Sequence, residues 1–365
     1  MRTLLANPVD NSSSDYWNNV VAEELWRFYE RRPCLGFETM RHATLLWLCF
    51  GTLITWPQLV NAEDIRHRLL VADSSSKRIA IIDEQGATEW EAEIGPLHDL
   101  HYLPNGHVLF QRNWTELIEV EPSDGKVVWR YDSANSPGNA GRRIEVHAFQ
   151  RLDNGLTMIA ESGASRIIEV DADGNVVHTV ALQVSKPDAH RDTRLVRKLA
   201  NGNYLVCHEG DGVVREYSYS GDIVWEFSVP LFGRSAAGGH GPEAWGNQCF
   251  TALRLSNGNT LVSTGNGHSV IEVTPGKDIV WKLTAEDLPG IELAWITTLQ
   301  VLQNGNIVLD NCHAGERNPQ LIEVDRNKKI VWQFRDFDRF GNSLTNTQVL
   351  SNNGHQVVAV LGVDR

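Results

Sequence analysis

The chain has 365 residues, enough for two ordinary domains, and a formal net charge of −13 at neutral pH. This acidity argues against a nucleic-acid partner and against docking on an anionic membrane surface. Thirteen histidines are many for this length, and their positions matter below.

Residues 40–62 have the layout of a secretory signal. The segment starts with a short basic stretch, continues as an apolar run over 43–55 and ends in Val60-x-Ala62 before acidic residues. We expect cleavage after Ala62. The apolar run is too short to favour a membrane span, so the mature chain is expected to have no transmembrane segment and to be periplasmic or secreted.

Residues 1–39 form a polar, mixed-charge leader, with which export signals do not normally begin. Our interpretation is that translation starts at Met40 and that the leader is an extension of the gene model. The pair Arg31-Arg32 offers a rival twin-arginine signal, although the residues around it fit poorly. The rest, 63–365, is expected to be one domain, and its three cysteines permit one disulfide at most.

The sequence after the signal repeats itself. Four segments of 27 residues align without a gap: "LPNGHVLFQRNWTELIEVEPSDGKVVW" (103–129), "LDNGLTMIAESGASRIIEVDADGNVVH" (152–178), "LANGNYLVCHEGDGVVREYSYSGDIVW" (199–225) and "LSNGNTLVSTGNGHSVIEVTPGKDIVW" (255–281). A fifth, at 302–332, carries four extra residues. Asn-Gly pairs begin at 105, 154, 201, 257, 304 and 353, so the spacing is 47 to 49 with one of 56. Such self-similarity indicates a propeller or a solenoid.

Each unit predicts four short antiparallel strands, A to D. An apolar run precedes Asn-Gly, the turn pair of a tight hairpin, and a β-branched run follows it. An alternating "IEV" segment, a second polar turn and "IVW" complete the unit. Four such strands make one propeller blade.

The two ends of the repeat region complement each other. Residues 69–90 align with strands B, C and D, whereas 343–354 supply a strand A with nothing after it. Joining them closes a ring and removes the open sheet edges. We therefore predict an all-β, six-bladed propeller of four-stranded blades closed by its N- and C-terminal strands. The remaining "HQVVAVLG" resembles a second strand B, for which this scheme has no place.

The strand directions place the variable B-to-C loops and D-to-A crossovers on one face, where we expect binding. Seven of the twelve histidines after residue 62 map to this mouth. His98 and His147 share a register seven residues before their Asn-Gly pairs, and they are the catalytic candidates. The candidate ligand-binding rim consists of Arg194, His208, Glu209, His240, Asn247, Asn266, His268, Asn311, His313 and Asn346.

Histidine can serve as nucleophile, general acid or base, or metal ligand. The alternative is that each one only satisfies a loop backbone. Cys207-His208 and Cys312-His313 recur in two blades with Cys249 in the blade between, which suits zinc or copper, but no close ligand spacing is present. Metal content stays open.

Two other features have competing interpretations. The segment 238–249, "GGHGPEAWGNQC", is either a lid over the channel or a flexible crossover, and Asn113-Trp114-Thr115 matches a common glycosylation acceptor. The recurring Trp90, Trp129, Trp225, Trp281 and Trp332 are expected to pack one blade against the next.

The units "VEPSDGKVVW", "YSYSGDIVW", "VTPGKDIVW" and "VDRNKKIVW" resemble the quinoprotein (PQQ)-type propeller repeat, whose Trp docks neighbouring blades. Residues 97–110, "LHDLHYLPNGHVLF", resemble the His-Asp…Leu-Pro-Asn-Gly-Asn signature of bacterial arylsulfotransferases, which are six-bladed periplasmic propellers with a histidine nucleophile. By that motif, His98 and His147 are the residues that correspond best to the nucleophile of those enzymes. The extra N-terminal β-domain of those enzymes has no counterpart here.

Three functions follow as hypotheses. The first is an exported propeller, possibly without catalysis, that binds a small molecule, a glycan or a protein at its loop face. The second is sulfuryl transfer through a channel histidine, with rim Arg and Asn holding the anionic oxygens. The third is a quinone- or metal-dependent oxidoreductase, although quinone-dependent relatives usually have eight blades. We expect a monomer, no nucleic-acid partner and no cofactor, with a metal or quinone left open.

Overall fold

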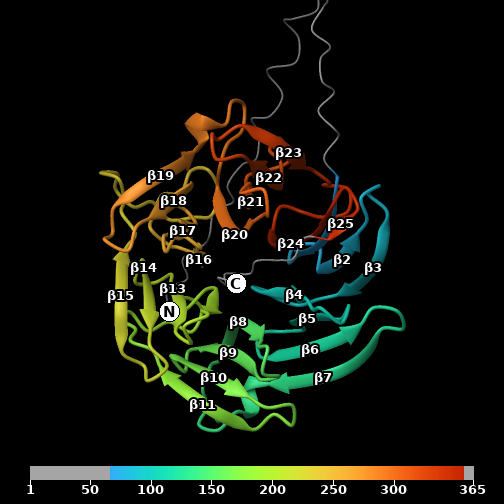
Figure 1. Cartoon of the computed structure of the whole chain (residues 1–365), viewed down its shortest axis with the longest axis vertical. Helices are drawn as coiled ribbons and strands as arrows, with labels where there is room; N and C mark the ends of the chain where they lie inside the picture. Colours follow the sequence, from blue (N-terminus) through green and yellow to red (C-terminus); the bar gives the residue numbers. More distant parts are fainter. Residues whose placement is uncertain (1–65, 357–365) are drawn as a thin grey trace, which may run out of the picture. The chain divides into compact units, whose positions relative to one another are not determined.

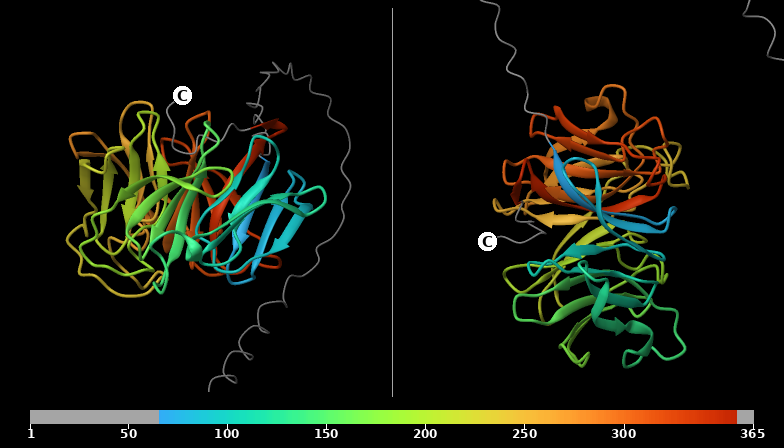
Figure 2. Two further views of the ribbon diagram at one scale, coloured as in Figure 1. Left: turned by 90° about the horizontal axis from the view of Figure 1, so that it is seen from below. Right: turned by 90° about the vertical axis from the view of Figure 1, so that its right-hand side faces the viewer.

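The computed structural model describes residues 66–356, and these form six antiparallel sheets arranged as blades around a central channel (Figure 1). Five of these sheets contain four strands that are consecutive in sequence, and the sixth joins C-terminal strands to the first three strands of the described chain, so the predicted all-β, six-bladed propeller is confirmed. Figure 2 shows the blades edge-on, with their connections gathered at two faces. Among the described residues no helix is long and apolar enough to cross a membrane.

The strands follow the repeat units closely. Blade 1 combines β24 (Leu344–Asn352), β1 (His67–Asp73), β2 (Arg78–Ile82) and β3 (Thr88–Glu93). Blade 2 contains β4 (Leu100–Tyr102), β5 (Val108–Gln111), β6 (Glu116–Glu121) and β7 (Lys126–Asp132), and blade 3 contains β8 (Glu145–Arg151), β9 (Thr157–Ser162), β10 (Arg166–Val170) and β11 (Val176–Ala181).

The remaining blades repeat this order. Blade 4 contains β12 (Val196–Lys198), β13 (Tyr204–His208), β14 (Val213–Tyr217) and β15 (Ile223–Ser228). Blade 5 contains β16 (Ala252–Arg254), β17 (Thr260–Ser263), β18 (Ser269–Val273) and β19 (Ile279–Thr284), and blade 6 contains β20 (Trp295–Val301), β21 (Ile307–Cys312), β22 (Leu321–Val324) and β23 (Ile330–Phe334). Two 3₁₀ turns, η1 (Ser133–Asn135) and η2 (Ala285–Asp287), lie in crossovers.

The ring closes between β1 and β24, as the repeat alignment predicts. The two strands pair antiparallel over seven residues, with Leu69 opposite Val349. Because β1 already occupies the strand-B edge of β24, the next segment cannot do so. The short β25 (His355–Gln356) pairs instead on the other edge of β24, and the rest of "HQVVAVLG" lies outside the described residues.

The recurring tryptophans dock each blade onto the next. Trp225 Nε1 donates to the Pro275 carbonyl at 3.0 Å, and Trp281 Nε1 donates to the Arg326 carbonyl at 3.1 Å, each in the C-to-D turn of the following blade. In blade 3 the repeat has His178 in place of Trp. Its Nε2 atom lies 3.0 Å from the Tyr219 carbonyl, which is also in the C-to-D turn of the following blade. At Trp129, His178, Trp225 and Trp281, a ring nitrogen thus contacts a backbone carbonyl of the next blade.

A buried glutamate in strand C ties the same interfaces. Glu272 accepts from the Asn259 amide at 2.7 Å within its own blade and pairs with Arg326 of the next blade. The Arg326 guanidinium also lies 4.8 Å from the Trp281 ring centroid. Although burial alone raises the pKa of Glu272, the Asn259 and Arg326 hydrogen bonds lower it overall, so the carboxylate stays ionised. The pattern recurs as Glu119 with Arg151 on Trp129, and as Glu216 with Arg254 on Trp225.

Apolar side chains fill every interface between blades. Five of the six buried clusters draw residues from two neighbouring blades, for example Leu109 of β5 with Phe149 of β8, and one of these five joins blade 6 to blade 1. The sixth cluster joins blade 3 to blade 4 and extends to Phe250, Trp295 and Cys312, which line the channel mouth. Burial of apolar area at about 25 cal/mol per Å² is the main stabilising contribution. No blade completes a core alone.

One rim candidate, His208, lies in this core at the end of β13. Its Nδ1 is 2.7 Å from the Asp192 carbonyl and its Nε2 is 2.9 Å from the Tyr217 hydroxyl. Burial lowers the pKa of His208 to about 4; the Asp192 carbonyl, Asp211 and Glu226 oppose that shift, and the nearby Arg215 charge reinforces it.

Glu272→Ala should lower the free energy of unfolding by about 1–3 kcal/mol, because the Asn259 amide and the Arg326 guanidinium lose their shared buried acceptor. Urea unfolding followed by circular dichroism measures this. Glu286→Ala, which removes an exposed carboxylate in the same blade, should change it by no more than about 0.5 kcal/mol. Equal losses in both variants would contradict the interblade role.

The burial of His208 makes stability depend on pH. Between pH 6.5, the ordinary histidine value, and about 4, the unfolded chain binds a proton at this position that the folded chain does not. The free energy of unfolding therefore falls as the pH falls through this window, with roughly 3 kcal/mol from His208 alone. His208→Gln should reduce the difference in urea unfolding between pH 7 and pH 4 by that amount, and an unchanged difference would refute the assignment.

Candidate functional site

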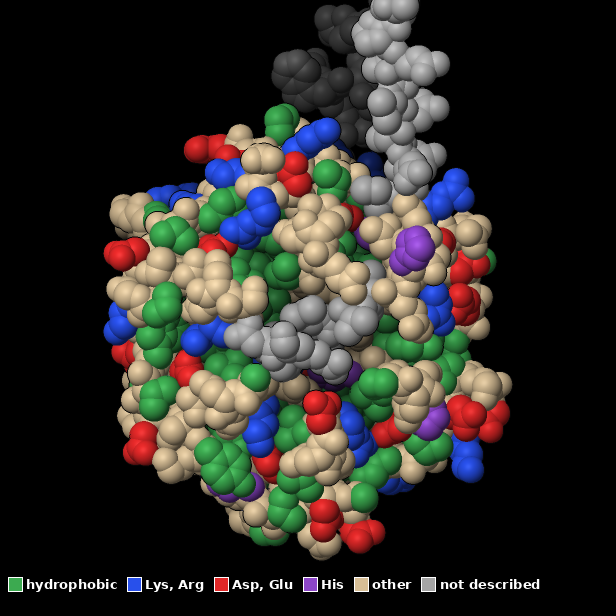
Figure 3. All heavy atoms as spheres, in the orientation of Figure 1, with side chains coloured by type: hydrophobic (Ala, Val, Ile, Leu, Met, Phe, Trp, Pro, Cys, Tyr) green, Lys and Arg blue, Asp and Glu red, His purple; other side chains and the backbone are tan. Residues whose placement is uncertain are grey.

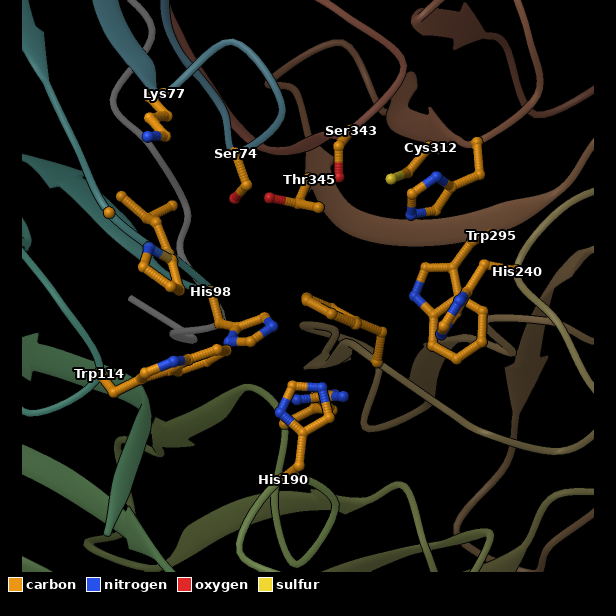
Figure 4. Close-up of a pocket in the computed structure, with 16 residues that line it drawn as sticks. Ser74, Lys77, His98, Trp114, His190, His240, Trp295, Cys312, Ser343 and Thr345 are labelled. Carbon is orange, nitrogen blue, oxygen red and sulfur yellow. The ribbon is translucent and has the colours of Figure 1, made fainter. Parts of the chain in front are cut away.

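The variable loops of the six blades meet at one mouth of the channel and enclose a cavity of about 350 Å³ (Figure 4). Its wall comes from B-to-C loops and D-to-A crossovers, the connections that strand direction assigns to this face. The lining residues are Ser74, Lys77, Gly95, Pro96, Leu97, His98, Trp114, His190, Arg194, His240, Phe250, Trp295, Cys312, His313, Ser343 and Thr345.

Two groups of rings face each other across the cavity. On one side the His98 ring lies 5.2 Å from the Trp114 ring, and the His190 ring lies 5.4 Å from Trp114. On the other side His240 contacts Trp295 edge to face at 4.5 Å, with His313 at 5.4 Å from His240. Figure 4 shows Trp114 and Trp295 at opposite sides, with the hydroxyls of Ser74, Ser343 and Thr345 along a third side.

The structure brings the two catalytic candidates together. The His98 and His147 ring centroids are 4.5 Å apart, although the residues come from different blades. The register of β8 against β9 shifts between Val146 and Ala148, so His147 is the extra residue of a β-bulge. Bulges re-aim side chains next to sites, and the His147 ring here lies against that of His98. His98 is held through its backbone, where its carbonyl accepts from Asn346 Nδ2 at 2.7 Å.

Arg194 lies beside this pair and is already neutralised. Its guanidinium forms an ion pair with Glu209, and both side chains are almost completely buried. It also packs over Phe250 at 5.7 Å, and its Nη1 lies 3.2 Å from His147 Nδ1.

Burial and this cation keep the two histidines neutral. Burial, followed by the Arg194 charge, lowers the pKa of His147 to about 4 and lowers the pKa of His98 well below 6.5. Neutral imidazoles have a free lone pair, which both nucleophilic attack and metal binding require.

A carboxylate that the sequence analysis did not select, Glu145, lies against them. Its Oε2 is 2.7 Å from His190 Nδ1 and 3.1 Å from His147 Nε2. Burial alone raises the pKa of Glu145, but the hydrogen bonds from His147 and His190 hold it well below the usual range, so Glu145 is ionised. The only signal in the sequence is its position two residues before His147, on the same face of strand A.

Several rim candidates instead hold backbone in place. Asn266 Oδ1 accepts from the Gln248 amide nitrogen and Asn311 Oδ1 accepts from the Ala294 amide nitrogen. Asn247 Nδ2 donates to the Val229 carbonyl, and His268 packs edge to face on Trp245. None of these four side chains, nor His208, is among the cavity-lining residues of the described chain.

The Cys–His pairs do not assemble a metal site within residues 66–356. Cys207, Cys249 and Cys312 are free and buried, and burial raises the pKa values of the Cys207 and Cys312 thiols, which disfavours thiolate ligands. In the described chain, the one cluster of three histidine, cysteine or carboxylate donors is Glu145 with His147 and His190.

Aromatic wall residues were also missed. Trp114 lies in a B-to-C loop within the glycosylation-like triplet, Phe250 has the same register as His98, and Trp295 begins strand A of blade 6. Aromatic residues are common in blades, so their type carries no signal until the loops are placed. The segment 238–249 contributes His240 to the wall.

Comparisons with known proteins agree with this architecture. A family model described as "PQQ_2: Outer membrane protein assembly factor BamB" matches residues 75–334. A crystal structure of a protein of unknown function from Bacteroides caccae is similar with a TM-score of 0.63 and 26% identity, over 77% of this chain and 98% of that chain. No curated protein sequence matches.

Two lyase structures share only the fold. A streptogramin B lyase structure matches with a TM-score of 0.50 and 12% identity, over 74% of this chain and 83% of that one. An inactive virginiamycin B lyase from Staphylococcus aureus with quinupristin matches with 0.50 and 14%, over 76% and 86%. Because the family model covers more than half of the chain, this protein belongs to the family of PQQ-type repeat propellers described as outer membrane protein assembly factor BamB.

Proposed function

We propose that this protein is an exported propeller that binds a small ligand with a flat apolar face, a sugar or an aromatic ring, in the cavity at the channel mouth. The observation that carries this proposal is the opposed pair of aromatic groups around Trp114 and Trp295. A volume of about 350 Å³ lies within the range of small-molecule sites, which are typically apolar with a few convergent polar groups. Tryptophan faces suit stacking on flat rings.

The polar groups give the cavity its selectivity. His98, His190, His240 and His313 present ring nitrogens, and Ser343 presents a hydroxyl. Arg194 is already paired to Glu209 and Lys77 is the one other Lys or Arg in the wall, so the wall consists mainly of neutral hydrogen-bonding groups that suit a hydroxyl-bearing ligand. Acidic and basic side chains are interspersed over the face seen in Figure 3, so recognition is assigned to the cavity and not to a charged surface.

Export is the second part of the proposal. The signal-like segment 40–62 lies outside the described residues, and its support is the sequence layout together with a family description that names an outer membrane assembly factor.

The intact mass of the protein recovered from the exported fraction of its native cells should correspond to a chain that starts at Glu63, because cleavage follows Ala62. A peptide from residues 3–26 in that fraction, or a mass that retains the leader, would overturn both the Met40 start and the cleavage site.

Trp114→Leu should weaken binding of 4-nitrophenyl glycosides at least tenfold, because the ligand loses one of its two aromatic walls. Titration calorimetry of the full chain measures this across a panel of such glycosides, each of which offers a sugar ring and an aromatic ring. Phe232→Leu replaces an aromatic residue of a crossover that does not line the cavity and should bind like the wild type. Binding that is insensitive to Trp114 would place the ligand elsewhere.

A second candidate, sulfuryl transfer, is favoured by the neutral His98 imidazole at the cavity with His147 beside it. The His98 nitrogen would attack the sulfur of an aryl sulfate and expel the phenolate, and an acceptor hydroxyl would then take the sulfuryl group. Including 4-nitrophenyl sulfate in the same panel separates the candidates: release of nitrophenol that His98→Ala abolishes supports transfer, whereas no release leaves the binding function alone.

A further inference from the structure

Three donor side chains, two from one strand and one from a crossover, converge beside the His98 and Trp114 rings of the cavity wall. Glu145 and His147 belong to strand β8, and His190 belongs to the crossover between β11 and β12. Their donor atoms all lie within 4.8 Å of one another. We propose that Glu145, His147 and His190 bind a divalent transition-metal ion, with zinc as the ion that fits the donor set. The site does not depend on which ligand the cavity takes.

The donor set and spacing fit zinc. Two imidazoles and one carboxylate are a known zinc ligand combination, in which a further position stays open for water or a ligand atom. Zinc bonds of about 2.0–2.2 Å place tetrahedral neighbours roughly 3.3 Å apart. Glu145 Oε2 lies 3.1 Å from His147 Nε2 and 2.7 Å from His190 Nδ1, so these two pairs would separate by roughly 0.2 Å and 0.6 Å, while the two histidine nitrogens lie within 4.8 Å of each other.

The contacts of the His147 ring favour a cation at its Nε2 atom. The Nδ1 atom lies 2.7 Å from the Thr193 carbonyl and the Nε2 atom faces Glu145 Oε2, so both ring nitrogens face acceptors. A neutral imidazole has only one N–H, so only one of these two contacts can be a hydrogen bond. If Nδ1 instead accepts from Arg194 Nη1 at 3.2 Å, its lone pair points at the Thr193 carbonyl.

A metal on Nε2 resolves this conflict. The Nδ1–H then donates to the Thr193 carbonyl, and the repulsion between the Nε2 lone pair and Glu145 becomes shared coordination. Histidines that bind metals commonly donate their other N–H to a backbone carbonyl, which fixes the tautomer and the ring orientation.

His98 provides a second, independent indication. Its ring centroid lies 4.5 Å from that of His147 and 5.7 Å from that of His190. Its Nδ1 atom is buried and has no hydrogen-bond partner within residues 66–356. A buried nitrogen without a partner costs free energy unless a ligand satisfies it. A water or ligand atom at the open metal position would be a partner for it, on the cavity side of the site.

The local charge also favours a cation. Arg194 is neutralised by Glu209, and Arg143, which pairs with Glu145, is largely exposed. Glu145 therefore remains the one buried carboxylate between two imidazoles, and its second oxygen has no competing buried cation among its described contacts. Buried carboxylates are normally paired or bound to metal.

The test uses the full chain, loaded with zinc sulfate, desalted and analysed for metal by mass spectrometry. The wild type should retain one zinc ion per chain more than His190→Ala does, and Glu145→Gln should lose the same ion. His190 is part-exposed in a crossover, so its replacement should leave the fold intact. Loading with cobalt(II) should give the wild type a visible absorption of low-coordinate cobalt that His190→Ala lacks, which a merely structural role would not produce.

His107→Gln is the matched control. His107 Nδ1 lies 2.7 Å from Glu119 Oε1, the distance seen between His190 and Glu145, but residues 66–356 offer this pair no third histidine, cysteine or carboxylate donor. This variant should keep the ion and the cobalt absorption. Equal zinc retention in the wild type and His190→Ala, or equal loss in His107→Gln, would overturn the proposal. Since neither readout needs a sugar or aryl ligand, its failure is distinguishable from failure of the binding function.

Discussion

The structure depends on the interaction of each blade with the next one. A strand-D ring such as Trp281 has its N–H partner only in the following blade, and the strand-C carboxylate Glu272 shares that blade's Arg326. Without the neighbour both interactions are lost, and the apolar cluster shared by the two blades is exposed to water. The chain must therefore close its ring, and β24 beside β1 completes the last two interfaces.

Closure fixes where chemistry can occur. The outer strands and the short turns pack against the neighbouring blades. The B-to-C loops and D-to-A crossovers on the opposite face are therefore free to differ in length and composition. The first residues of the strands A lie around the axis, so residues as distant in sequence as His98 and Thr345 line one cavity. Local irregularity then refines the wall: the bulge at His147 gives that side chain an orientation that regular pairing would not.

The channel mouth contains buried charged side chains, namely Arg194, Glu209 and Glu145. Arg194 is compensated by Glu209, whereas Glu145 lies between His190 and the buried His147, whose pKa is lowered by burial to about 4. Burying these charged and polar groups costs stability. Groups with strongly shifted pKa values cluster at binding and catalytic sites. The proposed ligand cavity and the proposed metal site share this wall, and each can be tested without the other.

Part of the candidate site could be predicted from the sequence and part of it could not. The shared spacing to Asn-Gly placed His98 and His147 at equivalent positions of two neighbouring blades, because a repeat register is also a spatial register. The same reasoning selected Asn266 and Asn311, whose amides bond to backbone, and it passed over Glu145. Rim position follows from the repeat, but the direction of a side chain in an irregular loop does not.

The sequence by itself determined the blade, the blade number and the closure, since each rests on local turn chemistry and periodic side chains repeated along the chain. Only the tertiary structure decided which rim residues meet. His190, in a crossover of no fixed register, comes within 2.7 Å of Glu145, which lies 45 residues earlier. That contact depends on loop paths and a bulge, and both are set by packing against neighbouring blades, which no single repeat encodes.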